Sequence, residues 1–107
     1  MGFLGGLRTG GTRAKRALTG LLADAATGDE LAVKRRLSEP VQITRGSEAR
    51  LSVSELVEEL SGCRVQKVIA AGRYVLAGVH RDGYRGVVIA ELALAGRGII
   101  GLRLFAE

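Results

Sequence analysis

The stretch from Arg64 to Glu107 most constrains the fold, because short runs of Val, Ile and Leu alternate there with glycine-containing breaks. The pattern predicts four antiparallel strands: Arg64–Ala70, Tyr74–Arg81, Tyr84–Ala95 and Gly98–Ala106. The breaks are typical of tight hairpins, since glycine adopts the positive φ that such turns require: Ala71-Gly72-Arg73, Asp82-Gly83 and Gly96-Arg97. We therefore expect one antiparallel sheet with helices covering one of its faces.

The N-terminal segment is predicted to be a flexible arm followed by a helix. Residues 1–11 hold five glycines and are expected to form the arm. From about Arg13 to Ala26, Ala and Leu recur at steps of three and four residues, which predicts an amphipathic helix. Arg13, Lys15 and Arg16 lie off its apolar stripe, in the first turns, where the helix dipole does not favour cations. We interpret them as a solvated basic face, with contact to an anionic partner as the alternative.

Two further helices and a short strand are expected before the sheet. Asp29 is placed to cap a second helix over Glu30–Leu37, and Pro40 follows it as a stop signal. The alternation of residues 41–45 predicts a short strand. Ser52 and Glu55 have the spacing of a capping box, which predicts the start of the third helix. Its apolar residues are expected to be buried: Val53, Leu56, Val57 and Leu60. Its glutamates are expected to face solvent: Glu55, Glu58 and Glu59.

Composition sets limits on the class of protein. With 107 residues, 47% of them hydrophobic, residues 12–107 can form one domain without disulfides or a structural metal. Cys63 is the only cysteine and there is one histidine, so we expect no disulfide, no metal site and a reducing cytoplasm. No apolar run reaches the ~20 residues of a membrane helix. The net charge is +5, but the chain has only four aromatic residues and no recognised nucleic-acid-binding motif, so we do not expect it to bind nucleic acid. It also has no phosphate-binding loop or other cofactor motif.

Three local patterns, in this order, resemble the nuclear-transport-factor-two-like superfamily, which includes SnoaL-like polyketide cyclases and ketosteroid-isomerase-like proteins. The first is Ala26-Thr27-Gly28-Asp29-Glu30-Leu31, which is similar to the junction between that family's first two helices. The second is Val68 to Val79, which resembles its long strand pair broken by a glycine. The third is Leu94 to Phe105, which is similar to its final hairpin. The resemblance covers residues 13–107.

The resemblance implies an α+β cone, in which three N-terminal helices pack on a curved antiparallel sheet and enclose an apolar pocket. It also implies that the other face of the sheet often makes a dimer. Catalytic members place Asp, Glu or His on inward strand positions. Period-two alternation on the last strand is expected to group Ile100 with Leu102 and Leu104, and to place Ile99, Gly101, Arg103 and Phe105 on the other face. The leucines stand where SnoaL-like enzymes tend to carry His and Asp, and leucine cannot transfer a proton.

Few residues remain as candidates for chemistry. His80, Asp82 and Tyr84 could form an acid–base cluster, but Asp82-Gly83 has the pattern of a hairpin turn at the sheet rim, which we favour. Glu91 could be a buried base, or it could pair with Arg73 or Arg103, which we also favour. Tyr74 could line a pocket or a dimer interface.

We therefore expect a non-catalytic domain with an apolar cavity, which binds a small hydrophobic ligand or a protein partner and forms a homodimer through the sheet. The predicted ligand-binding residues are Tyr74, Leu76, Ile100, Leu102 and Leu104. The alternative is an isomerase or cyclase that uses Glu91, His80 or Tyr74 in the cavity. A third possibility is a scaffold whose basic first helix contacts an anionic surface.

Overall fold

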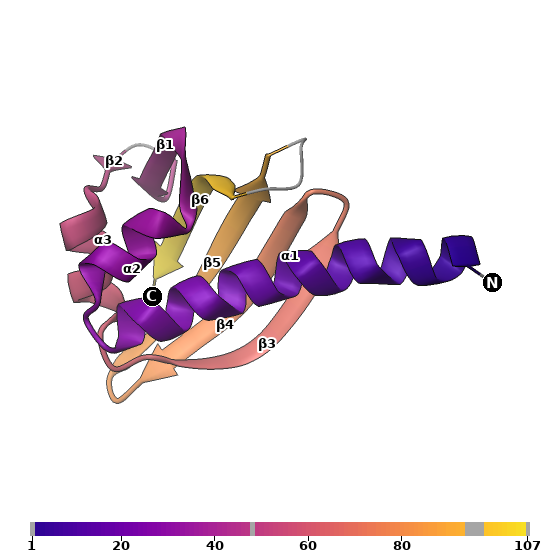
Figure 1. The fold of residues 1–107 in the computed structure, drawn as a ribbon. Helices are drawn as coiled ribbons and strands as arrows, with labels where there is room; N and C mark the ends of the chain where they lie inside the picture. Colours follow the sequence, from indigo (N-terminus) through magenta and orange to yellow (C-terminus); the bar gives the residue numbers. More distant parts are fainter. Residues whose placement is uncertain (1, 48, 94–97, 107) are drawn as a thin grey trace.

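The computed structural model describes the backbone of residues 2–47, 49–93 and 98–106, and within these ranges the side chains from Thr12 onward. The elements in chain order are α1 (Gly2–Ala26), α2 (Glu30–Arg35), β1 (Leu37–Arg45), β2 (Ala49–Arg50), α3 (Val53–Leu60), β3 (Arg64–Ala71), β4 (Tyr74–Arg81), β5 (Tyr84–Leu92) and β6 (Ile99–Ala106). The helices lie along one face of the sheet, and α1 runs across the width of that face (Figure 1). The expected α+β class is confirmed, with β1 and β2 placed between α2 and α3.

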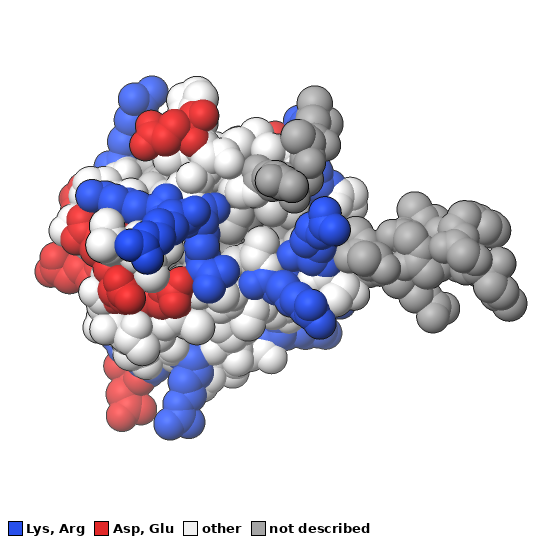
Figure 2. Space-filling model, viewed as in Figure 1, with Lys and Arg blue, Asp and Glu red and all other residues white. Residues whose placement is uncertain are grey.

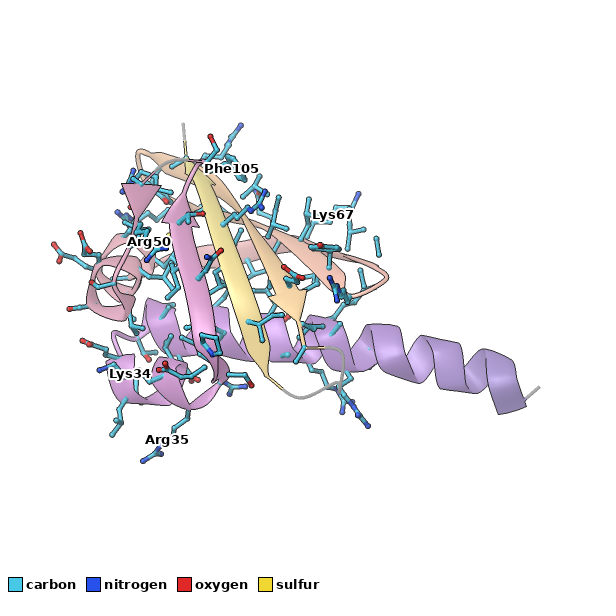
Figure 3. All side chains as sticks on the ribbon, turned by 90° about the horizontal axis from the view of Figure 1, so that it is seen from above. Lys34, Arg35, Arg50, Lys67 and Phe105 are labelled. Carbon is cyan, nitrogen blue, oxygen red and sulfur yellow. The ribbon has the colours of Figure 1, made fainter. Side chains whose placement is uncertain are left out.

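The sheet has six strands in the order β2-β1-β6-β5-β4-β3. The predicted four-stranded meander, β3 to β6, is confirmed as a run of antiparallel neighbours. Strand β1 begins at Leu37, earlier than expected, and pairs in parallel with β6. Register shifts interrupt the β1–β6, β3–β4 and β5–β6 pairings. Because such irregularities bend and twist strands, they account for the curvature visible in Figure 1 and Figure 3.

The predicted turns and caps are confirmed where the structure describes them. Arg81 pairs with Tyr84 across a two-residue turn, and Gly83 has a φ of +74°. Ser52 Oγ accepts a hydrogen bond from the Glu55 amide at 3.0 Å, and the Glu55 carboxylate accepts one from the Ser52 amide at 2.9 Å. The hydrogen bond from the Ser52 backbone, and secondly the Ser52 side chain, hold the pKa of the Glu55 carboxyl group below its usual value. The expected turn at Gly96-Arg97 lies outside the described residues.

Helix α1 begins at Gly2, earlier than the expected start at about Arg13, and has 25 residues. The side chains of residues 1–11 lie outside the described part, so the flexible arm and the domain boundary after residue 11 stay predictions. None of the described helices is long and apolar enough to cross a membrane.

The core lies between the helices and the sheet. Leu18 and Leu21 of α1 and Leu56 and Leu60 of α3 are fully buried there. The sheet contributes small and branched side chains that are at most 1% exposed: Val75, Ala77, Val79, Val88, Ala90, Ile99, Leu102 and Leu104. Every buried side chain in the described part of the chain is apolar.

One expected face assignment is wrong. Ile99 is fully buried in the core together with Leu102 and Leu104, whereas Ile100 is only partly buried. The β5–β6 register shifts between Glu91 and Leu92, so that Glu91 faces Gly101 while Leu92 faces Ile99. This bulge reverses the alternation at the start of β6, which a strict period of two cannot anticipate.

Candidate functional site

The sheet face that carries no helix, which we call the open face, exposes several large apolar side chains. They are Ile69, Tyr74, Leu76, Val87 and Phe105, between 37% and 49% exposed, with partly buried Ile89 beside them. Leu76 pairs with Ile69 on one side and Ile89 on the other, so these three form a continuous row across β3, β4 and β5. Seen from above, the open face lies in front of α1, with Lys67 and Phe105 among its side chains (Figure 3). Contiguous exposed apolar surface of this kind marks an interaction site more often than a single exposed residue does.

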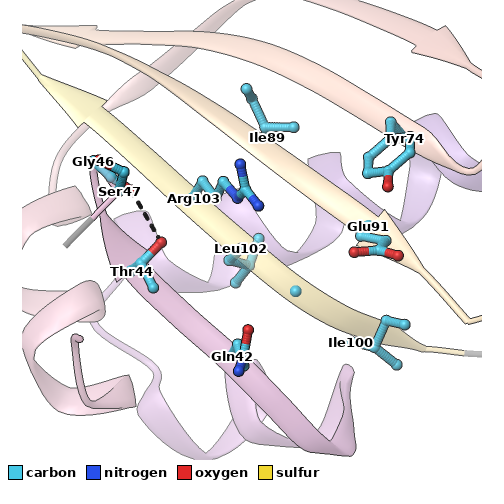
Figure 4. Close-up of a pocket in the computed structure, with 11 residues that line it drawn as sticks. Gln42, Thr44, Gly46, Ser47, Tyr74, Ile89, Glu91, Ile100, Leu102 and Arg103 are labelled. Carbon is cyan, nitrogen blue, oxygen red and sulfur yellow. Dashed lines mark hydrogen bonds between the residues drawn. The ribbon is translucent and has the colours of Figure 1, made fainter. Parts of the chain in front are cut away.

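A hollow of about 230 Å³ interrupts the open face above Gly101. Gly101 pairs with Gln42 on β1 and with Glu91 on β5, and since it has no side chain, the flanking residues border an empty position. The rest of the lining, shown in Figure 4, consists of Thr44, Gly46, Ser47, Tyr74, Ile89, Ile100, Leu102 and Arg103. A β-carbon added at Gly101 would lie 3.5 Å from the Glu91 β-carbon, an ordinary contact distance. The missing side chain of Gly101 thus contributes to the hollow.

The charge on the rim is partly paired. The Glu91 carboxylate lies 3.0 Å from the Arg73 guanidinium, as expected from the sequence, and both side chains are partly exposed. Arg73 also lies 5.9 Å from the centre of the Tyr74 ring. Arg103 is exposed, and no ion pair involving it is found among the described residues. The hollow is therefore bordered by one carboxylate, which is paired with Arg73, and by the guanidinium of Arg103.

The predicted ligand-binding residues do not share one surface. Tyr74 and Ile100 border the hollow, and Leu76 lies next to it in the apolar row. Leu102 and Leu104 are 1% exposed and belong to the core on the opposite face, although Leu102 also contributes to the lining of the hollow. This separation follows from strand alternation and from the bulge that shifts Ile100 away from the leucines.

The candidate acid–base residues are also divided. His80 lies on the open face between Arg64 and Arg85, as the register requires. Tyr84 lies at the other face, where its hydroxyl donates a hydrogen bond to Glu59 of α3 at 2.6 Å. Asp82 occupies the hairpin turn between them. Glu91 and Tyr74 are cross-strand neighbours, so the structure brings together only these two of the candidates.

Glu59 was expected to face solvent, and the structure places it in a polar cluster that the sequence did not reveal. Its carboxylate accepts hydrogen bonds from Tyr84 and from Arg45. Arg81 donates to the Ser61 carbonyl at 2.8 Å, and its guanidinium lies 4.6 Å from the centre of the Tyr84 ring. Burial, and then the nearby Cys63, raise the pKa of Tyr84. The cluster ties α3 to β1, β4 and β5, and since its hydrogen bonds join residues 14 to 25 positions apart, no local pattern signals it.

Comparisons with known proteins identify the fold. No family model matches the chain, and the search of curated proteins found no match. Among solved structures, it is similar to an NTF2-like protein of unknown function from Cytophaga hutchinsonii, with a TM-score of 0.66, 14% identity, and 88% of this chain and 89% of that chain covered. It is also similar to an inferred SnoaL-like polyketide cyclase from Jannaschia sp. CCS1, with a TM-score of 0.68, 12% identity, and coverage of 91% and 87%.

A third similar structure is an LEH-like epoxide hydrolase from M. tuberculosis, with a TM-score of 0.67, 18% identity, and coverage of 91% and 84%. At these identities the likeness concerns the backbone and carries no residue roles. It agrees with the resemblance seen in the helix junction, the strand pair and the final hairpin. This chain has the cone fold of the nuclear-transport-factor-two-like superfamily.

Proposed function

We propose that this chain is a non-catalytic, partner-binding domain whose open face pairs with a second copy of itself. The observation that carries the proposal is the row of exposed Ile69, Leu76 and Ile89, extended by Tyr74, Val87 and Phe105. Burying such side chains against an equivalent surface removes apolar area from water, which is the main driving force of protein association.

A protein partner accounts for the structure better than a small ligand within the fold. The inner face of the sheet is occupied by core side chains of α1 and α3, and the exposed large apolar side chains of the sheet lie on the open face. The runner-up, an isomerase or cyclase, draws no comparable support. Glu91, His80 and Tyr74 all lie on the open face, outside the space that the helices cover.

The charges beside the hollow allow a second copy as the partner, with Arg73 remaining the neighbour of Glu91 within each chain. Glu91 pairs with Gly101, which lies two residues before Arg103 on β6. Glu91 and Arg103 are therefore diagonal neighbours on adjacent strands, a relation in which the Cα atoms lie about 7–8 Å apart. A two-fold axis that lies in the interface and passes between them places Glu91 of each copy opposite Arg103 of the other. The same patch thus supplies both partners of two ion pairs, as an isologous interface requires.

Sedimentation velocity over a range of protein concentrations tests the proposal. We expect wild type to be a dimer and Leu76→Ser with Ile89→Ser to be a monomer that keeps its circular dichroism spectrum. Leu31→Ser is the matched control, because Leu31 is 61% exposed on α2, away from the open face. A wild type that stays monomeric at every concentration, or an open-face variant that dimerises as wild type does, would overturn the proposal.

A further inference from the structure

A second surface, on the opposite side of the molecule, is built around a glycine inside α1. A β-carbon added at Gly20 would lie 2.6 Å from the Arg36 Cζ atom and 2.9 Å from Nη2. The guanidinium of Arg36 therefore occupies the space that any other residue at position 20 would fill. Glycine in the interior of a helix is destabilising relative to alanine. Gly20 therefore weakens α1 slightly but leaves the space that the Arg36 guanidinium occupies.

Asp24 fixes the orientation of the same guanidinium. Arg36 Nε donates a hydrogen bond to Asp24 Oδ2 at 2.6 Å. No other hydrogen-bond partner of this guanidinium is found in the described part of the chain, and the side chain is 41% exposed. The two Nη groups are thus held in place with donors still available. A guanidinium held in this way loses less conformational entropy when it binds an oxyanion.

Arg13 and Arg16 continue this surface along α1. Positions 13, 16, 20 and 24 follow one another at steps of three and four residues, so they share one side of the helix. With Arg36 seated over Gly20, three guanidiniums form a line, which we call the arginine row: Arg13, Arg16 and Arg36. Lys and Arg side chains gather in front of α1 and α2, whereas Asp and Glu gather toward the end where α3 lies (Figure 2).

We propose that the arginine row docks on an anionic phospholipid surface through its phosphate groups. Guanidinium binds phosphate by paired, charge-assisted hydrogen bonds. The row lies on one side of a helix about 37 Å long, so its members can contact a flat surface together.

The sequence before Asp24 contains no acidic residue and carries Arg8, Arg13, Lys15 and Arg16, a composition typical of helices that bind membrane surfaces. Nucleic acid fits less well, because the described aromatic residues lie on β4, β5 and β6 and offer no stacking group near the row.

Vesicle cosedimentation of the full chain tests the proposal. We expect binding to vesicles of phosphatidylglycerol and phosphatidylcholine that weakens with salt, and no binding to phosphatidylcholine alone. Arg13→Glu with Arg16→Glu should reduce the partition coefficient about tenfold or more. Lys67→Glu with Arg85→Glu changes the net charge equally on exposed strand positions and should retain most of the binding. Equal losses in both variants, or no binding of wild type to anionic vesicles, would contradict the proposal.

Gly20→Ala tests the seat of Arg36 without changing any charge. The added methyl group displaces the guanidinium, while alanine favours the helix, so the variant should fold and bind anionic vesicles severalfold more weakly. Unchanged binding would show that the seat has no role. A duplex DNA or RNA that binds wild type where anionic vesicles do not would assign the row to nucleic acid instead. The expected losses for Arg13→Glu with Arg16→Glu and for Gly20→Ala do not depend on whether the open face forms a dimer. Lys67→Glu with Arg85→Glu changes that face, so its binding is compared with that of wild type at a protein concentration where sedimentation velocity finds both in the same oligomeric state.

Discussion

The two faces of the sheet come from the same strands but differ in how much apolar surface they expose to solvent. On β4, Val75, Ala77 and Val79 are at most 1% exposed, whereas Tyr74 and Leu76, which alternate with them, are 44% and 37% exposed. The inner face uses small and branched side chains that let α1 and α3 approach closely. On β4 the open face carries the larger side chains, and no described residue of the chain covers them. One face is buried within a single chain, and we propose that a second copy buries the other.

The distribution of charge follows the same division. Among the described residues, no charged side chain is buried, and the inner face meets apolar groups except at its end, where the polar cluster of Glu59, Arg81 and Tyr84 lies. The open face mixes its apolar row with Arg73, Glu91 and Arg103. Stability of the single chain should therefore depend on the inner face, and recognition should depend on the open face.

The largest effect is expected from the same substitution made on each face. Leu102→Ala removes a side chain that is 1% exposed and should lower the free energy of unfolding by about 2–5 kcal/mol. Leu76→Ala removes one that is 37% exposed and should cost less than about 1 kcal/mol for the single chain. Urea denaturation at low protein concentration measures both. Similar losses would mean that the faces do not differ as described.

A smaller effect is expected where the polar cluster closes the end of the inner face. Tyr84→Phe removes the 2.6 Å hydrogen bond to Glu59 and should cost about 1–2 kcal/mol. The pKa of Tyr84 is raised from 10.0, so its contribution is present below about pH 10 and is lost as the pH rises through the folded-state pKa. In denaturation experiments at neutral and alkaline pH, the free energy of unfolding should fall less with rising pH for Tyr84→Phe than for the control Tyr74→Phe. Parallel declines would exclude Tyr84 as the cause.

The smallest effect is expected in the hollow of the open face. Gly101→Ala places a methyl group at an ordinary contact distance and should change the free energy of unfolding by no more than about 0.5 kcal/mol. Gly98→Ala is the contrasting variant, because Gly98 has a φ of +79° and an added β-carbon would lie 3.0 Å from the Ser38 β-carbon. It should cost more than about 1 kcal/mol. A large loss for Gly101→Ala in thermal denaturation would mean that this position belongs to the packed structure.

Much of the fold could be predicted because its signals are local. The hairpin at Asp82-Gly83, the capping box of Ser52 and Glu55, and the alternating strands each lie within a few residues, and the structure has all three. The parallel pairing of β1 with β6 joins segments some sixty residues apart, and the bulge that buries Ile99 is a register shift between β5 and β6 that no local sequence signal marks. For the same reason the Glu59 cluster and the hollow at Gly101 could not be found from the sequence. The candidate residues were identified individually, but their assignment to opposite faces required the register.

Mixing two charge variants tests the central claim, that the open face pairs with a second copy, most directly. Glu91→Arg and Arg103→Glu each place like charges opposite one another in a two-fold dimer, while a mixed dimer of the two variants restores both ion pairs. Sedimentation velocity should find each variant predominantly monomeric alone and a one-to-one dimer in the mixture. Variants that dimerise alone as wild type does, or a mixture that remains monomeric at concentrations where wild type is a dimer, would contradict the account.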